Sequence, residues 1–268
     1  MLYLSLFTDT CVVGFICHQR DEMKGRSLAR IGLIFYFFLL LVTPGRGEKT
    51  QPFEPGEKLT YRVKLFGLPA GEQTLEIKDT VKINGSLTYY LFSRVRTTNP
   101  ISLFWHFDRQ IESFVDVKTL YPLRVTIHSE EGSRIKDREV ELDQTQGIAL
   151  IKDWKGEFKR EFSLPAMDTV SLIYWLRAQD LRVGKSFSLS LIEGRNLRKV
   201  EIKVLKKEEV TTYSGNYSAF LCSEEVASDK TQVKLWISDD GRHLPVKFQA
   251  PTSIGTLTAS LTNVEAAD

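Results

Sequence analysis

Short runs in which apolar and polar residues alternate one by one place the strongest constraint on the fold of this 268-residue chain. Residues 59–65 alternate in this way, and similar or β-branched runs recur to the end of the chain. A period of two puts every second side chain on one face of a β-strand. Turn pairs such as Asn84-Gly85 and Asp240-Gly241 separate runs that follow one another at roughly 8–12 residues, which predicts an antiparallel sandwich or barrel.

One stretch, residues 168–180, breaks this pattern. Asp168 can cap the N-terminus of a helix there. A helix of about three turns is too little for an α/β protein, so we expect it to cover an open edge or end of the sheet. The predicted fold class is all-β dominated: a strongly curved, open-barrel-like antiparallel sheet, or two related β lobes, with one short central helix. The apolar residues near helical spacing are Val170, Ile173, Tyr174 and Leu176.

The two halves of the chain resemble each other. Asp116 lies six positions before Pro122, and Asp239 lies six positions before Pro245. An apolar, a basic and an apolar residue follow each proline. Since proline cannot donate to a strand ladder, we expect each to begin a strand, with an aspartate bonding backbone groups of the turn before it. β-hairpins also look alike by chance, but several features in near register favour a duplicated β lobe.

The duplication predicts a division of the chain. An N-terminal β lobe covers residues 48–164, a connecting helix lies within 165–183, and a C-terminal β lobe covers 184–268. Gly56 and Gly184, 128 positions apart, each open a strand of the respective lobe.

Residues 23–47 have the features of a secretory signal peptide. The apolar run 31–42 is too short for a bilayer span of about 20 residues but suits the hydrophobic region of a signal. A basic leader precedes this run, and Gly45 and Gly47 provide the small residues of a cleavage site before Glu48. An uncleaved single-helix anchor is the alternative.

Either Met1 or Met23 can be the true start. Met23 begins the signal, which leaves 1–22 as upstream sequence or a longer leader. Residues 48–268 contain 31 basic and 31 acidic residues, and this balance argues against nucleic acid as a partner. We expect a periplasmic protein with no permanent membrane span after cleavage. Its one remaining cysteine, Cys222, lies in an apolar stretch and is expected to be a buried, inert thiol.

No motif for catalysis or metal binding stands out. The mature histidines, His106, His128 and His243, share no metal-ligand spacing with another His or with Cys. A nucleophile elbow, a phosphate-binding glycine loop and a zinc-protease motif are all lacking from the sequence. We therefore expect a protein that is not an enzyme and uses no metal and no cofactor. An unrecognised hydrolase is the minor alternative, because the members of a triad can be distant in sequence.

Aromatic residues give the candidate binding site. Phe104, Trp105 and Phe107 form the densest cluster, and Tyr174 and Trp175 lie on the predicted helix. Together they could line an apolar pocket for a lipid-like or aromatic ligand. The other interpretation is that they pack between the sheet and the helix.

Three blocks of the sequence resemble the bacterial domain-of-unknown-function family 3108. The resemblance covers about residues 53–264 and implies an exported protein of a Gram-negative envelope, with no assigned activity and no catalytic residues to carry over. The last block is also similar to a hairpin of periplasmic lipoprotein carriers, whose fold is a curved open β-barrel with helical cover. The blocks are FEPGEKLTY (53–61) with PAGE (69–72), DTVSLIYWLR (168–177) with VGK (183–185), and WISDDGRHLPVK (236–247).

These features predict a non-enzymatic periplasmic protein that binds an apolar or amphiphilic component of the envelope. The alternative is an envelope scaffold or assembly factor that binds protein or glycan through exposed strand edges.

Overall fold

The computed structural model of the chain describes residues 51–163, 165–224, 233–252 and 255–266. The predicted upstream segment 1–22 and signal peptide 23–47 lie outside these residues. In the part that is described, no helix combines the length and the hydropathy that a membrane span requires.

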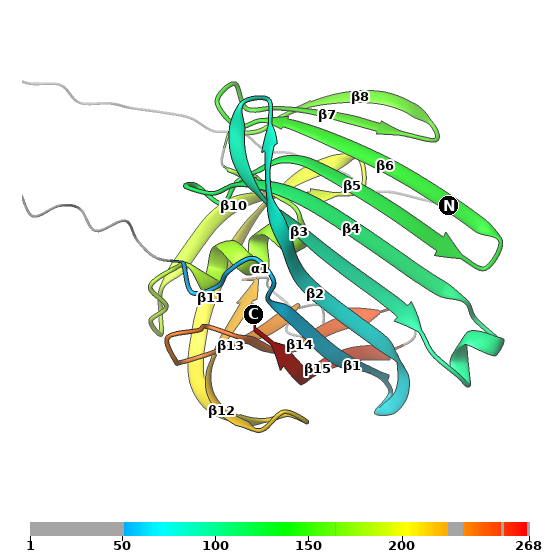
Figure 1. Ribbon diagram of the computed structural model, residues 1–268, viewed down its shortest axis with the longest axis vertical. Coiled ribbons are helices and arrows are strands. Elements are labelled where there is room, and N and C mark those ends of the chain that lie inside the picture. Colours follow the sequence, from blue (N-terminus) through cyan, green and yellow to red (C-terminus); the bar gives the residue numbers. More distant parts are fainter. Residues whose placement is uncertain (1–50, 164, 225–232, 253–254, 267–268) are drawn as a thin grey trace, which may run out of the picture. The chain divides into compact units, whose positions relative to one another are not determined.

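The described residues form one sheet of fifteen strands, which confirms the predicted β-dominated fold class (Figure 1). Its spatial order is β8-β7-β6-β5-β4-β3-β2-β1-β15-β14-β13-β12-β11-β10-β9. All neighbouring strands are antiparallel except the short pair β9 and β10. The strands are β1 (Lys58–Leu65), β2 (Leu68–Ile83), β3 (Ser86–Thr97), β4 (Phe107–Asp116), β5 (Pro122–Glu131), β6 (Arg134–Asp143), β7 (Ile148–Asp153), β8 (Gly156–Glu161), β9 (Ala166–Met167), β10 (Ser186–Glu193), β11 (Asn196–Thr211), β12 (Asn216–Glu224), β13 (Lys234–Ser238), β14 (Pro245–Thr252) and β15 (Gly255–Glu265).

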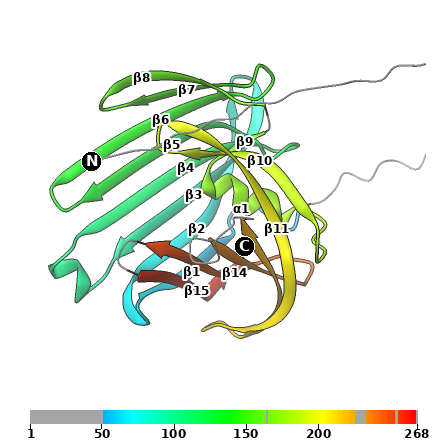
Figure 2. The same cartoon turned by 180° about the vertical axis from the view of Figure 1, so that it is seen from behind.

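One α-helix, α1 (Thr169–Arg177), packs on the inner face of the sheet, around which the strands curve (Figures 1 and 2). The predicted cap is confirmed: the Asp168 carboxylate accepts from the backbone N–H groups of Val170 and Ser171. Such a cap stabilises a helix by about 1 kcal/mol. Tyr174 packs with strands of the N-terminal half, and Leu176 packs with strands of the C-terminal half. The helix thus fills the space between the two halves. A 3-10 turn (Ile101–Leu103) lies between β3 and β4.

The two proline hairpins have the same construction. Pro122 is the first residue of β5 and Pro245 is the first residue of β14, as their sequence positions predict. In both hairpins the strand pairing shifts by one residue just beyond the proline pair. The residue two positions before each proline, Leu120 or His243, has a positive φ, of 60° and 44° respectively.

The aspartates of these turns correspond in a different way from the prediction. Oδ1 of Asp116 accepts from the N–H groups two and three residues on, at 3.0 and 2.9 Å. Oδ1 of Asp240 makes the same two bonds, at 3.0 and 3.1 Å. Asp239, which the sequence pairs with Asp116, instead forms an ion pair with Lys207. The pairing of Asp116 with Asp239 was therefore wrong by one position, because the second turn reaches its proline in one residue fewer.

The strand openings also match. The N–H of Gly56 donates to the Ile77 carbonyl at 2.7 Å, and that of Gly184 donates to the Val204 carbonyl at 2.8 Å. A shift in strand pairing follows both Ile77 and Val204. Each of the strands β1 to β6 thus corresponds to one of the strands β10 to β15, in the same order. The lengths of the first two pairs agree: β1 and β10 have 8 residues each, and β2 and β11 have 16 each. Both halves belong to one sheet, and their duplication and division at 165–183 stay predictions.

Candidate functional site

The helical members of the predicted binding site lie in the packed core. Tyr174 is fully buried, and its ring lies 5.2 Å from that of Phe53 in an edge-to-face contact. Trp175 is half-buried, and its ring lies 5.4 Å from that of Phe187. Edge-to-face pairs of this kind are typical of protein interiors.

The other predicted members lie at one end of the sheet. Phe104 and Trp105 follow the 3-10 turn between β3 and β4, and their exposed fractions are 89% and 41%. The Trp105 ring lies 5.6 Å from that of Phe107, the half-buried first residue of β4. Within the described ranges no ring contact joins Phe104 or Trp105 to Tyr174 or Trp175. The structure therefore separates the five residues into a loop group and a helix group, and their role in binding stays a prediction.

The loop group belongs to a larger set of exposed apolar side chains, which we call the apolar rim. In an antiparallel sheet the β1–β2, β3–β4, β5–β6 and β7–β8 connections all leave from one end of the strands, and Figure 1 shows them on one side. Large apolar side chains at loop tips expose apolar surface to water, and this exposure costs about 25 cal/mol of free energy per Å². Exposed apolar side chains that gather at one end of a sheet are candidate sites of contact. The apolar rim comprises Phe66, Leu68, Leu103, Phe104, Trp105, Ile135 and Trp154.

Five members of the apolar rim escaped the sequence analysis: Leu103, which lies beside the predicted loop cluster, and Phe66, Leu68, Ile135 and Trp154, which lie at three other turns. In the sequence, the clearest sign of an exposed apolar residue is Phe66, which stands directly before Gly67 in a turn. In the structure, Phe66 has a positive φ of 53°. A bulky side chain with a positive φ is uncommon. Trp154 is itself a turn residue, Leu68 directly follows a turn, and Ile135 lies two residues after one, in places where polar side chains are usual.

A buried ion pair joins α1 to the start of β1. The Arg177 side chain is fully buried, and its Nη1 and Nη2 donate to the two carboxylate oxygens of Glu57 at 2.5 and 2.8 Å. Nε and Nη2 of Arg177 also donate to the backbone carbonyls of His243 and Arg242, at 3.1 and 3.2 Å. Burial is the largest effect on Arg177 and opposes its charge, but the hydrogen bond to Glu57 and the negative charge of Glu57, with smaller contributions from Tyr174 and Tyr61, together raise the pKa of the guanidinium.

This ion pair brings together the three sequence blocks that carry the family resemblance. Glu57 lies in the first block, Arg177 in the second, and His243 in the third. The Tyr61 hydroxyl of the first block also donates to the Pro245 carbonyl of the third, at 2.7 Å. Residues of all three blocks therefore meet in one structural junction.

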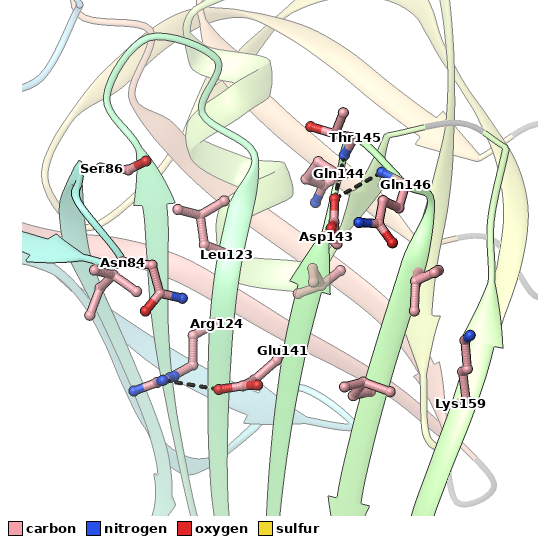
Figure 3. Close-up of a pocket in the computed structure, with 14 residues that line it drawn as sticks. Asn84, Ser86, Leu123, Arg124, Glu141, Asp143, Gln144, Thr145, Gln146 and Lys159 are labelled. Atoms are coloured by element: carbon pink, nitrogen blue, oxygen red, sulfur yellow. Dashed lines mark hydrogen bonds and ion pairs between the residues drawn. The ribbon is translucent and has the colours of Figure 1, made fainter.

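A groove of about 570 Å³ lies between the β2–β3 turn and the β6–β7 turn (Figure 3). Its Arg124 is bonded to Glu141 at 3.0 Å and lies 3.6 Å from Glu139. The Asp143 carboxylate accepts from the N–H groups of Thr145 and Gln146, so it serves to hold the turn. These contacts use Arg124, Glu141 and Asp143 to stabilise the sheet and the turn.

Two histidines that are distant in sequence meet on the outer face of the sheet. Nε2 of His106 lies 3.4 Å from one carboxylate oxygen of Glu130, and Nε2 of His128 lies 3.1 Å from the other. Nδ1 of His128 lies 2.6 Å from Asp137. The bonds to Asp137 and then to Glu130 raise the pKa of His128. Over the described ranges, no group of three or more His, Cys, Asp or Glu side chains has an arrangement that could hold a metal ion.

Two further side chains with nucleophilic atoms, Ser113 and Cys222, are buried. The Ser113 hydroxyl donates to the Asp168 carboxylate at 2.7 Å, which ties β4 to the start of α1. Cys222 is buried and free, as expected, and desolvation by burial raises the pKa of its thiol to about 12.

Comparison with known proteins gives a family and a fold. Residues 60–262 match the model of a family described as "Protein of unknown function (DUF3108)". No curated protein matches the chain. A β-barrel-like protein of domain of unknown function DUF1849 from Brucella abortus has a similar structure, with a TM-score of 0.55 and 12% identity, over 81% of this chain and 99% of that one. A DUF1089 family protein from Pseudomonas aeruginosa gives a TM-score of 0.40 and 11% identity, over 66% and 88% of the two chains.

Proposed function

The chain belongs to the DUF3108 family, whose function is unknown, and from this premise we propose a function on the basis of its own geometry. The protein is an exported, non-enzymatic component of the periplasm that binds an apolar or amphiphilic component of the envelope at the apolar rim.

The clustering of exposed apolar side chains at one end of the strands carries this proposal. Isolated exposed apolar residues are normal on soluble proteins, but seven at the same end of neighbouring strands are not randomly placed. Two of them, Trp105 and Trp154, are amphipathic side chains that suit the boundary between apolar and aqueous phases. We place the binding surface at the rim and not in the interior pocket expected from the sequence, because the Tyr174 ring is fully buried and packs against Phe53.

The basic and apolar leader in residues 23–47 supports export. A ligand of the envelope then follows from the compartment, since membrane lipids and lipid-modified proteins are the amphiphiles that a periplasmic protein meets.

The alternative, binding of a partner through a strand edge, has less support. β8 is the outermost strand at one end of the sheet order, and most of its side chains are exposed. It also carries Glu157, Lys159, Arg160 and Glu161. Charged side chains along an edge strand are typical of edges that avoid further pairing.

The test removes apolar side chains from the rim. We replace Phe104 and Trp105 together by Ser, with Leu150→Ser as the matched control, because Leu150 is 50% exposed on the outer face of β7. Binding of dodecyl maltoside below its micelle concentration is measured by titration calorimetry, and lipids that copurify from the periplasm are quantified by native mass spectrometry.

We expect the rim variant to bind about tenfold more weakly or worse, since each large apolar side chain is worth about 1.5–3 kcal/mol when buried. The Leu150→Ser variant should bind like the unchanged protein. Equal affinity and equal lipid content in the rim variant and the unchanged protein would show that the rim is not the binding surface.

A further inference from the structure

A group of four cationic side chains lies beside the apolar rim on the inner face of the sheet. Arg109 of β4 shares a face with the core residue Ile111, because residues two apart in a strand point the same way. Lys136 and Arg138 of β6 share the inner face with Val140 by the same alternation. Arg195, in the β10–β11 turn, reaches the same region and lies 5.2 Å above the Phe158 ring, which packs against the core.

The carboxylates next to these cations are fewer. Nε of Arg195 lies 2.6 Å from Oδ2 of Asp153, and Nε of Arg138 lies 3.8 Å from the same oxygen. The Lys136 ammonium lies 3.9 Å from Glu131. Among the side chains that the structure describes, these contacts set two carboxylates against four cations. The nearby carboxylate of Asp168 is bonded to Ser113 and to the N-terminus of α1.

Several of these groups have hydrogen-bonding capacity that the protein does not use. Nη2 of Arg195 is buried without a hydrogen-bond partner in the described part of the chain, and Nε of Arg138 is buried with only the 3.8 Å ion-pair contact to Asp153. Arg109 is exposed, so its guanidinium can be reached from solvent. Buried guanidinium donors without partners are costly, and an anionic ligand would satisfy them.

The cations also repel one another. Desolvation, and then the positive charge of Arg138, lower the pKa of Arg109. Desolvation and the charge of Arg195 lower the pKa of Arg138, against the opposing effect of Asp153. An anion placed between them would relieve this repulsion.

Trp154 connects the cationic group to the apolar rim. Its ring, a member of the rim, lies 4.8 Å from the Arg195 guanidinium and 5.6 Å from the Lys136 ammonium. Arg138 lies 5.8 Å from the same ring. The Trp105 ring similarly contacts the Phe107 ring. Phe107 lies two residues before Arg109, on the same face of β4. A ligand can therefore contact the apolar rim and the cations at once.

We propose that the protein binds an amphiphile with a phosphate or carboxylate headgroup, which Arg109, Arg138 and Arg195 hold while its acyl or alkyl chain lies against the apolar rim. This inference rests on the proposed function and adds the charge of the ligand to it. Guanidinium groups suit both headgroups because their paired N–H donors match two oxygens.

The experiment compares three probes by titration calorimetry: dodecyl phosphate, dodecyl maltoside and inorganic phosphate. The variant carries Arg109→Gln and Arg138→Gln together. Arg124→Gln is the matched control, because Arg124 also sits on a strand of the sheet but pairs with Glu141 and Glu139 on the outer face. Near-ultraviolet circular dichroism checks that each variant is folded.

We expect the unchanged protein to bind dodecyl phosphate at least about tenfold more tightly than dodecyl maltoside. Hydrogen bonds between the guanidinium groups and a charged headgroup would increase the affinity by about that factor. The Arg109/Arg138 variant should lose this preference and keep its affinity for dodecyl maltoside, while Arg124→Gln keeps the preference. Higher salt should weaken binding of dodecyl phosphate alone, and this measurement needs no variant.

Each contrary result has a separate meaning. Equal affinities for the two dodecyl probes would overturn the headgroup site and leave the proposed function standing. Inorganic phosphate binding as tightly as dodecyl phosphate would overturn the lipid headgroup in favour of a site for soluble anions. Failure of both dodecyl probes to bind would overturn the proposed function itself, and this inference with it.

Discussion

Replacing Glu57 by Gln tests the junction between α1 and the strands most directly. The amide keeps the shape of the carboxylate but removes the charge that faces the fully buried Arg177. The guanidinium then keeps neutral acceptors, namely the new amide oxygen and the backbone carbonyls of Pro52, Arg242 and His243, but loses its anionic partner. An uncompensated buried charge of this kind costs about 3–5 kcal/mol.

This cost is large beside the whole stability of a domain, which is about 5–15 kcal/mol. Urea unfolding of the unchanged protein and of Glu57→Gln, followed by tryptophan fluorescence, measures the loss as a shift of the midpoint at constant m value. Glu72→Gln is the matched control, because Glu72 pairs with Arg96 at 3.3 Å on the surface, with exposed fractions of 39% and 47%. A surface pair contributes about 0–1 kcal/mol.

A second variant separates charge from packing. Glu57→Leu combined with Arg177→Met removes both charges, and we expect it to regain most of the stability that Glu57→Gln loses, because two apolar side chains leave no charge to desolvate. Two results would refute this reasoning: a loss in Glu57→Gln no larger than that in Glu72→Gln, or a double variant as unstable as the sum of its single variants.

Three further predictions concern the turns, the thiol and the outer face. Asp240→Ala should cost about 1 kcal/mol, since it removes two backbone bonds, whereas Asp239→Ala should cost less; urea midpoints decide, and the reverse order would contradict the turn assignment. Cys222 should react with a thiol reagent far more slowly in the native protein than in denaturant, given a pKa of about 12, and equal rates would contradict its burial. Asp137→Asn should lower the pKa of His128 toward 6.5 in a proton NMR titration. Protonated His128 stabilises the folded protein fully below pH 6.5, and this stabilisation is lost as the pH rises through the raised pKa of the folded state. A variant whose His128 titrates as in the unchanged protein would contradict the contact between His128 and Asp137.

Local patterns were enough to predict the elements of the fold. The alternation of apolar and polar residues predicted the strands, and the spacing of apolar residues after Asp168 predicted α1. The prolines predicted where β5 and β14 begin. The single error in the turn, Asp239 for Asp240, arose because counting from the proline assumes turns of equal length.

The candidate site was less predictable, because it depends on which face and which end of a strand each residue occupies. Trp154 and Phe104 lie 50 positions apart in the sequence, and only the antiparallel order places both at one end of the sheet. Arg109 and Arg195 come from opposite halves of the chain, so their proximity depends on the curvature of the whole sheet. Periodicity describes neither relation.

The pairing of β1 with β15 joins the two ends of the described chain, with Lys58 opposite Glu265. The pair between β1 and β15 can therefore form only after almost the whole described chain is available. Contacts over such sequence distances fold slowly, since loop closure comes before any gain from the contact. Under the export that we propose, we expect the sheet to be completed only after β15 has crossed the membrane.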